Sequence, residues 1–151
     1  MLSLALPFTL RAGLVARCVA LAFAMLIAPV AARADDVAAG RQVIESQINA
    51  FLNDDMQTAY SFAAPSIKRL YPDENRFFDM VKRGYQPVYR PGNFAFGRSK
   101  SAADGSGLVQ EVLIQGPDGQ DWTALYSLER QPDGSLKING VQMIKAAAPQ
   151  T

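Results

Sequence analysis

The spacing of apolar residues changes at Gly84, and this change limits the possible folds more than any other feature of the sequence. Before Gly84, apolar side chains recur every three or four residues, which is the period of an amphipathic helix. After Gly84 they recur at every second position, as in a strand with one buried face. Helices followed by strands predict an α+β fold, in which the helices cover one face of an antiparallel sheet.

The helical part divides at turn-forming and proline-containing points. A helix is predicted over 37–52, and it ends at 53–55 because Asn and Asp favour turns and helix caps. A second helical stripe covers 56–64 and stops before a proline, since the residue before a proline resists helical geometry. Residues 66–71 are predicted to form a single turn between two prolines.

A further helix is predicted to begin at Asp73 and to end at Gly84. Acidic residues stand at its start and basic residues near its end, which suits the helix dipole. Gly84 occupies the position where a left-handed residue stops a helix. The predicted buried stripe consists of Phe77, Phe78 and Val81, helped by Met80.

The second half is predicted to form about four strands in a meander. Residues 85–92 carry two prolines and are predicted to be extended, at an edge or in a connection. Phe94 and Phe96 alternate in the first strand, and a phase change in the last strand predicts a β-bulge at 139–140. Turn sequences rich in Gly and Asp lie at 104–107, 116–119 and 131–134. The third strand places one set of side chains on one face: Trp122, Ala124, Tyr126 and Leu128.

Residues 1–34 have the three parts of a secretion signal. A basic segment precedes an uncharged apolar run of about 15 residues, shorter than the roughly 20 that a membrane span needs. Small residues at Ala32 and Ala34 predict cleavage before Asp35. We therefore expect a periplasmic or secreted protein with one domain at 35–145, a flexible tail at 146–151 and no stable membrane span. An uncleaved membrane anchor is the alternative.

The composition of the predicted mature chain excludes several kinds of chemistry. The chain has no histidine, and its one cysteine, Cys18, leaves with the signal. Thiol and imidazole nucleophiles, zinc sites built on them and disulfides are therefore absent, and no metal or cofactor is predicted. The mature part holds 12 basic and 14 acidic residues, a net charge of −2. Without a basic patch, nucleic acid is not expected as a partner.

Two segments resemble a bacterial family catalogued as domain of unknown function 4864. The first carries Ile44, Gln47, Phe51, Asp54, Tyr60, Pro65, Phe77, Val81, Gly84 and Pro87. The second is the ending 133–141, with Leu136 where a tryptophan is common. The family is similar to the nuclear transport factor 2-like superfamily, a cone-like, cystatin-like architecture with helices against a strongly curved sheet. That resemblance implies a fold and leaves the activity open, because superfamily members include isomerases, dehydratases, binding modules and partner-binding domains.

Two groups of residues are candidates for a site. Asp54 and Asp55 lie at a helix junction. If buried, they could hold a hard cation or act as an acid or base; the alternative is that one of them caps the next helix. The second group is aromatic and polar, and it either binds a small ligand in an apolar pocket or covers the open end of the sheet. It consists of Tyr60, Tyr85, Tyr89, Arg90, Trp122 and Tyr126.

Three functions remain open from the sequence. The favoured one is non-catalytic binding of a small apolar or carboxylated molecule, or of a protein partner. The second is an isomerase- or dehydratase-like enzyme of the cone fold, which needs a buried carboxylate with a raised pKa beside Tyr60 or Tyr89. The third is a dimerisation module, which implies a homodimer.

Overall fold

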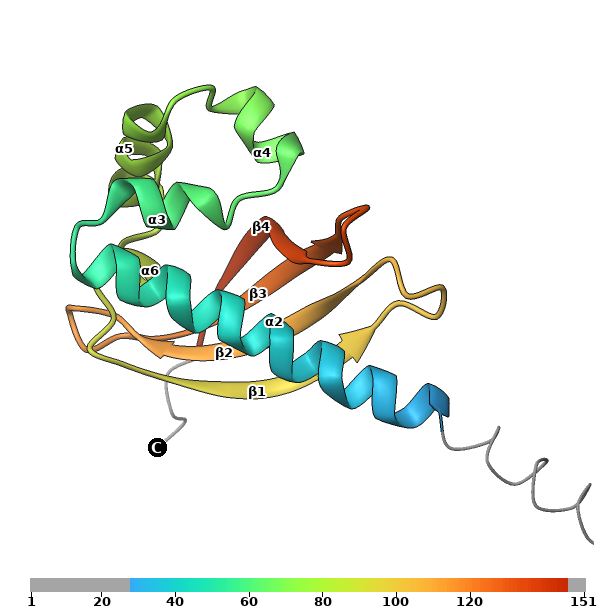
Figure 1. Ribbon diagram of the computed structural model, residues 1–151. Coiled ribbons are helices and arrows are strands. Elements are labelled where there is room, and N and C mark those ends of the chain that lie inside the picture. Colours follow the sequence, from blue (N-terminus) through green and yellow to red (C-terminus); the bar gives the residue numbers. More distant parts are fainter. Residues whose placement is uncertain (1–27, 147–151) are drawn as a thin grey trace, which may run out of the picture. The chain divides into compact units, whose positions relative to one another are not determined.

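The computed structural model describes residues 28–146, and in this range helices are followed by strands (Figure 1). The helices are α2 (Ala28–Leu52), α3 (Met56–Ser61), α4 (Pro65–Leu70), α5 (Glu74–Gly84) and α6 (Gln86–Tyr89). The strands are β1 (Asn93–Ser101), β2 (Gly107–Gln115), β3 (Asp121–Arg130) and β4 (Leu136–Lys145). The predicted α+β order is confirmed.

The chain divides into two units, residues 1–34 and 35–151, and the second contains the sheet. Most of the predicted signal, 1–27, and most of the predicted tail, 147–151, lie outside the described residues. Both assignments therefore stay predictions. Helix α2 passes through the expected cleavage position after Ala34 without a break.

The sheet is an antiparallel meander in the order β1-β2-β3-β4. Each of its three turns contains a glycine with positive φ, at Gly105, Gly119 and Gly134, inside the three predicted turn sequences. The predicted bulge in β4 is confirmed: Ser127 pairs with Gly140 and Leu128 with Ile138, so Asn139 is the additional residue. A second irregularity, in β1 between Phe96 and Ser99, was not predicted.

The core lies between α2 and one face of the sheet. Ile44 and Ile48 of α2 are fully buried, as are Val112 of β2 and Tyr126 of β3. The predicted stripe of α5 is confirmed, since Phe77, Phe78 and Val81 are buried. The third-strand face is confirmed as the inner one: Ala124, Tyr126 and Leu128 are buried and Trp122 is half-buried.

The helix predicted over 37–52 begins earlier, at Ala28, and the helix predicted over 56–64 ends earlier, at Ser61.

Two predictions about the chain around Tyr85 were wrong. Gly84 is the last residue of α5 and has no positive φ, because the chain passes through Tyr85 directly into another helix. The segment predicted to be extended contains α6, in which Pro87 occupies the first turn. Proline is compatible with that position, where its missing N–H would have no helical partner.

Candidate functional site

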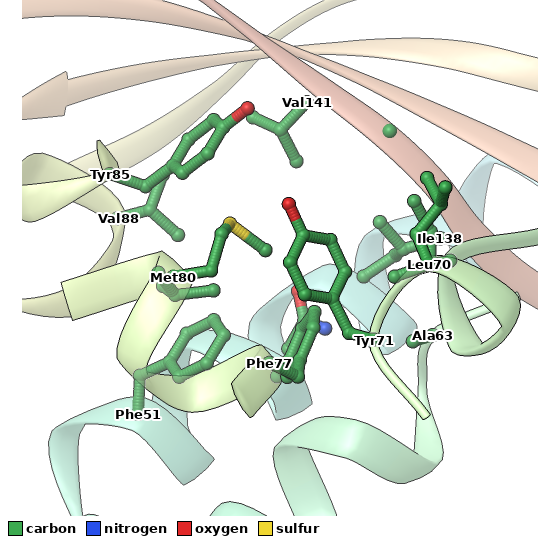
Figure 2. A pocket seen from close by; sticks show the side chains of 14 residues that line it. Phe51, Ala63, Leu70, Tyr71, Phe77, Met80, Tyr85, Val88, Ile138 and Val141 are labelled. Carbon is green, nitrogen blue, oxygen red and sulfur yellow. The ribbon is translucent and has the colours of Figure 1, made fainter. Parts of the chain in front are cut away.

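A pocket of about 230 Å³ lies between the helical segments and β4 (Figure 2). The pocket opens to the surface at Leu70, a lining residue that is 72% exposed. None of its described lining residues carries a charge. The lining residues are Gln47, Phe51, Ala63, Ile67, Leu70, Tyr71, Phe77, Met80, Val81, Tyr85, Val88, Ile138, Gly140 and Val141.

Local sequence places two tyrosines at corners of the chain beside this pocket. Tyr71 ends α4 and precedes Pro72, so it takes a non-helical conformation, with φ −124° and ψ 83°. Tyr85 joins α5 to α6, and its carbonyl oxygen accepts the N–H groups of Val88 and Tyr89 at 2.9 Å each. Both tyrosines are therefore the capping residue at the end of a helix, Tyr71 of α4 and Tyr85 of α5.

The hydroxyl groups of Tyr71 and Tyr85 are turned toward the strand side of the pocket, with Met80 between the two rings (Figure 2). Both residues are half-buried, and neither hydroxyl is among the buried polar atoms that lack a partner, so both are open to water. No hydrogen bond joins either hydroxyl to the described part of the chain. The Tyr60 hydroxyl, in contrast, donates to the backbone oxygen of Tyr71 at 2.7 Å. The pocket thus offers two tyrosine hydroxyl groups on a largely apolar wall. The amide of Gln47, which is buried and donates to the Ala59 oxygen at 3.1 Å, is a third polar group in the lining.

Strand β4 forms the opposite wall, and the bulge at Asn139 shapes it. The chain before α4 is tied to this strand, since Ala64 N–H donates to the Ile138 oxygen and Ile138 N–H donates to the Phe62 oxygen, both at 2.8 Å. At Gly140, a Cβ atom would meet nothing within 4 Å. The chain between α3 and α4 is therefore held against β4 at Ile138, while space remains beside Gly140.

Asp55 acts as a helix cap. Its Oδ1 accepts the Thr58 N–H at 3.0 Å at the start of α3, and this bond holds the pKa of the Asp55 carboxyl below its usual value. The side chain is exposed. The capping interpretation is confirmed for this residue.

Asp54 has a different role, because it ends α2. It takes a left-handed conformation, with φ 55°, and its N–H donates to the Phe51 oxygen at 3.1 Å. Its carboxylate accepts the Tyr89 hydroxyl at 2.5 Å and pairs with Arg90 at 2.8 Å. The hydrogen bonds from Tyr89 and Arg90 lower the pKa of Asp54. We call Asp54, Tyr89 and Arg90 the Asp54 cluster.

The Asp54 cluster leaves Arg90 with little capacity for a ligand. The Arg90 guanidinium also donates to the Phe51 carbonyl oxygen at the end of α2, and its central carbon lies 3.8 Å from the centre of the Tyr89 ring. The hydrogen bond to Asp54 raises the pKa of Tyr89. The structure thus brings together members of both predicted groups, and they satisfy one another.

The remaining predicted residues lie in the core or beside it. Tyr126 is fully buried, its hydroxyl has no partner among the described residues, and burial raises its pKa. The Trp122 indole N–H is likewise buried without a described partner. Tyr60 packs against Phe77, with ring centres 5.5 Å apart. Of the six predicted ligand-binding residues, Tyr85 alone lines the pocket.

Tyr71 and Met80 line the pocket but were not predicted to bind a ligand. Met80 was predicted as core, and Tyr71 was placed in a plain turn. The available signal was the position of Tyr71 directly before Pro72, because an aromatic residue at a helix-ending proline projects from a corner rather than from a packed stripe.

Residues 28–146 contain neither a candidate metal-binding cluster nor a candidate membrane-spanning helix. No group of three or more Asp, Glu, His or Cys side chains could hold a metal ion there. No helix in that range combines the length and apolar character needed to cross a membrane.

Comparison with known proteins identifies the chain only at the level of a family. No curated protein and no solved structure matches it. The model of one family, described as a domain of unknown function, DUF4864, matches residues 33–151, which include the whole sheet and every residue of the pocket. The chain therefore belongs to the DUF4864 family.

Proposed function

We propose that the domain binds a small, largely apolar molecule in the pocket between the helical segments and β4, without catalysis. The observation that carries the proposal is the composition of the wall: aromatic and aliphatic side chains surround the amide of Gln47 and the hydroxyl groups of Tyr71 and Tyr85, and no charged side chain among the described residues lines it. Small-ligand sites commonly combine an apolar lining with a few polar groups that orient the ligand.

The charged groups support binding rather than catalysis. An acid–base enzyme of the predicted kind needs a desolvated carboxylate with a raised pKa. Asp54 and Asp55 are exposed, their pKa values are lowered, and neither lines the pocket. The two properties that the isomerase-like alternative requires are therefore missing at these residues.

The proposal includes a place in the nuclear transport factor 2-like superfamily and a location outside the cytoplasm. Helices packed on one face of a four-stranded meander, with a bulge in the last strand, support the superfamily placement. The signal-like pattern of residues 1–34 supports export to the periplasm or the medium.

A second candidate function is pairing of two copies through the sheet face that the helices leave uncovered. Three large apolar side chains are exposed on it: Val109 at 39%, Leu113 at 48% and Ile144 at 44%. Leu113 and Ile144 both pair with Thr123, so they share one row across the sheet. Light scattering, which measures the molar mass in solution, tests this candidate on the unchanged protein and on Leu113→Glu. The candidate requires the unchanged protein to be a dimer and Leu113→Glu to be a monomer.

Binding in the pocket is tested by blocking it. Val141→Phe adds an aromatic ring to a half-buried position of the lining, and Leu113→Phe adds the same ring on the uncovered face as a matched control. Toluene is titrated into each purified protein while backbone amide shifts are recorded by NMR. We expect shifts at the pocket residues that disappear in Val141→Phe and persist in Leu113→Phe. Shifts that persist in Val141→Phe would contradict the proposal.

A further inference from the structure

We infer that the pocket selects a neutral molecule with one aromatic ring, or an apolar chain of similar size, whose single polar group is a hydrogen-bond acceptor held by Tyr71 and Tyr85. This inference rests on the proposed function and specifies its ligand class. Three observations carry it: the volume of the pocket, the absence of charge in its described lining, and the two hydroxyl groups.

The volume limits the ligand to about one ring. The pocket measures about 230 Å³. An engineered apolar cavity of about 150 Å³ in another protein binds benzene, whereas pockets for drug-sized ligands measure about 300–1,000 Å³. A single ring with a short substituent falls between these limits.

The distribution of charge selects a neutral ligand. An ion taken into an apolar site needs an opposite charge, because desolvation is otherwise unfavourable. Three cations on the helical segments around the pocket contact other groups. Arg90 pairs with Asp54, and the Lys82 ammonium lies 4.9 Å from the Phe78 ring centre and 5.5 Å from that of Tyr89. The Lys68 ammonium of α4 lies 4.9 Å from the Tyr60 ring centre. The carboxylated ligand considered from the sequence is therefore disfavoured.

The hydroxyl groups suit a hydrogen-bond acceptor. Each phenol O–H can donate one hydrogen bond, and a carbonyl oxygen has two lone pairs that can accept them. The backbone of both tyrosines is held before the ligand arrives: the Tyr71 oxygen accepts the Tyr60 hydroxyl, and the Tyr85 oxygen accepts two N–H groups at the α5–α6 corner. The backbone therefore needs no ordering on binding, and this reduces the entropic cost of the two bonds.

The test compares three probes of similar size, namely acetophenone, toluene and benzoate, by calorimetry and by NMR shifts of the pocket amides. We expect acetophenone to bind roughly tenfold more tightly than toluene, from one or two net hydrogen bonds. Benzoate is expected not to bind in the pocket. The variants Tyr71→Phe and Tyr85→Phe are each expected to weaken acetophenone binding roughly 3- to 10-fold and to leave toluene unchanged.

Tyr89→Phe is the matched control, because its hydroxyl bonds to Asp54 and it does not line the pocket. It should leave the ratio of acetophenone to toluene affinity unchanged. Three outcomes overturn the inference: equal affinity for acetophenone and toluene, an affinity ratio that is unchanged in the double variant Tyr71→Phe/Tyr85→Phe, or benzoate binding more tightly than the other two probes. In each case, binding of toluene in the pocket leaves the proposed function intact. Failure of all three probes to shift the pocket amides overturns both.

Discussion

The Asp54 cluster and the pocket both contact Phe51, and they use tyrosine hydroxyls in opposite ways. Phe51 contributes its ring to the pocket wall and its carbonyl oxygen to Arg90. In the cluster, the Tyr89 hydroxyl is bound to a carboxylate of the same chain. In the pocket, the hydroxyls of Tyr71 and Tyr85 have no described partner. Polar groups that satisfy one another stabilise a fold, and those left unpaired on an apolar wall are available to a ligand.

Phe51→Ala removes the side chain that the two regions share, and we expect the largest loss of stability from it. The ring is 1% exposed and lies 5.7 Å from the Phe78 ring centre and 6.3 Å from that of Phe77. Truncating a buried phenylalanine costs about 3–5 kcal/mol. Urea denaturation measures the loss. Leu52→Ala is the control, because Leu52 is 42% exposed and should change stability by no more than about 0.5 kcal/mol.

Similar losses of stability from Phe51→Ala and Leu52→Ala would contradict the packing role that we assign to the Phe51 ring between the Asp54 cluster and the pocket.

The fold followed from the sequence because its signals are local. The helical spacing of apolar residues gives way to alternation between α6, which ends at Tyr89, and β1, which begins at Asn93. A glycine with positive φ lies in each of the three predicted turn sequences. The helix α6 was missed because the two prolines of residues 85–92 were interpreted as typical of an extended edge or connection, although proline also suits a first helical turn. A local pattern of two prolines supports both interpretations.

The candidate site could be predicted only in part, because its chemistry depends on which groups face one another. Tyr85 and Tyr89 are four residues apart, yet Tyr85 lines the pocket and Tyr89 binds Asp54. Asp54 and Arg90, predicted in separate groups, form one ion pair across 36 positions of sequence. A residue list identifies groups that can bind a ligand, and packing decides which of them are already occupied.

Asp54→Asn tests the cluster through its dependence on pH. Because the folded-state pKa of Asp54 lies below its ordinary value of 3.8, ionised Asp54 stabilises the fold above that value, and this contribution is lost as pH falls through the folded pKa. We expect Asp54→Asn to be less stable than the unchanged protein at pH 7. The difference should narrow between about pH 5 and pH 2. Thermal unfolding at a series of pH values measures it.

The matched control is Asp79→Asn, since Asp79 is 60% exposed and lies 3.6 Å from Arg83 on one helix. It should keep the pH profile of the unchanged protein. Parallel profiles for Asp54→Asn and the unchanged protein would contradict the role assigned to the cluster.

Tyr126→Phe tests a third state of a tyrosine hydroxyl, buried and without a described partner. Removing an unsatisfied buried hydroxyl removes its desolvation penalty, so we expect stability to stay equal or to rise by about 1 kcal/mol. Urea denaturation of this variant beside the unchanged protein measures the change. A loss of more than about 1 kcal/mol would show that the hydroxyl bonds to a buried water molecule.

Tyr60→Phe and Tyr71→Phe give the sharpest comparison, because Tyr71 is involved in both: the first variant removes a hydroxyl that bonds to its backbone, and the second removes its own hydroxyl. The Tyr60 hydroxyl donates to the Tyr71 oxygen, so its loss should lower stability by about 0.5–1.5 kcal/mol. The Tyr71 hydroxyl has no partner in residues 28–146, so its loss should change stability by less than about 0.5 kcal/mol. Urea denaturation resolves the two. A loss of stability from Tyr71→Phe equal to that from Tyr60→Phe would mean that the Tyr71 hydroxyl already stabilises the fold. It would then not be available to a ligand, and the contrast between the Asp54 cluster and the pocket would fail at Tyr71.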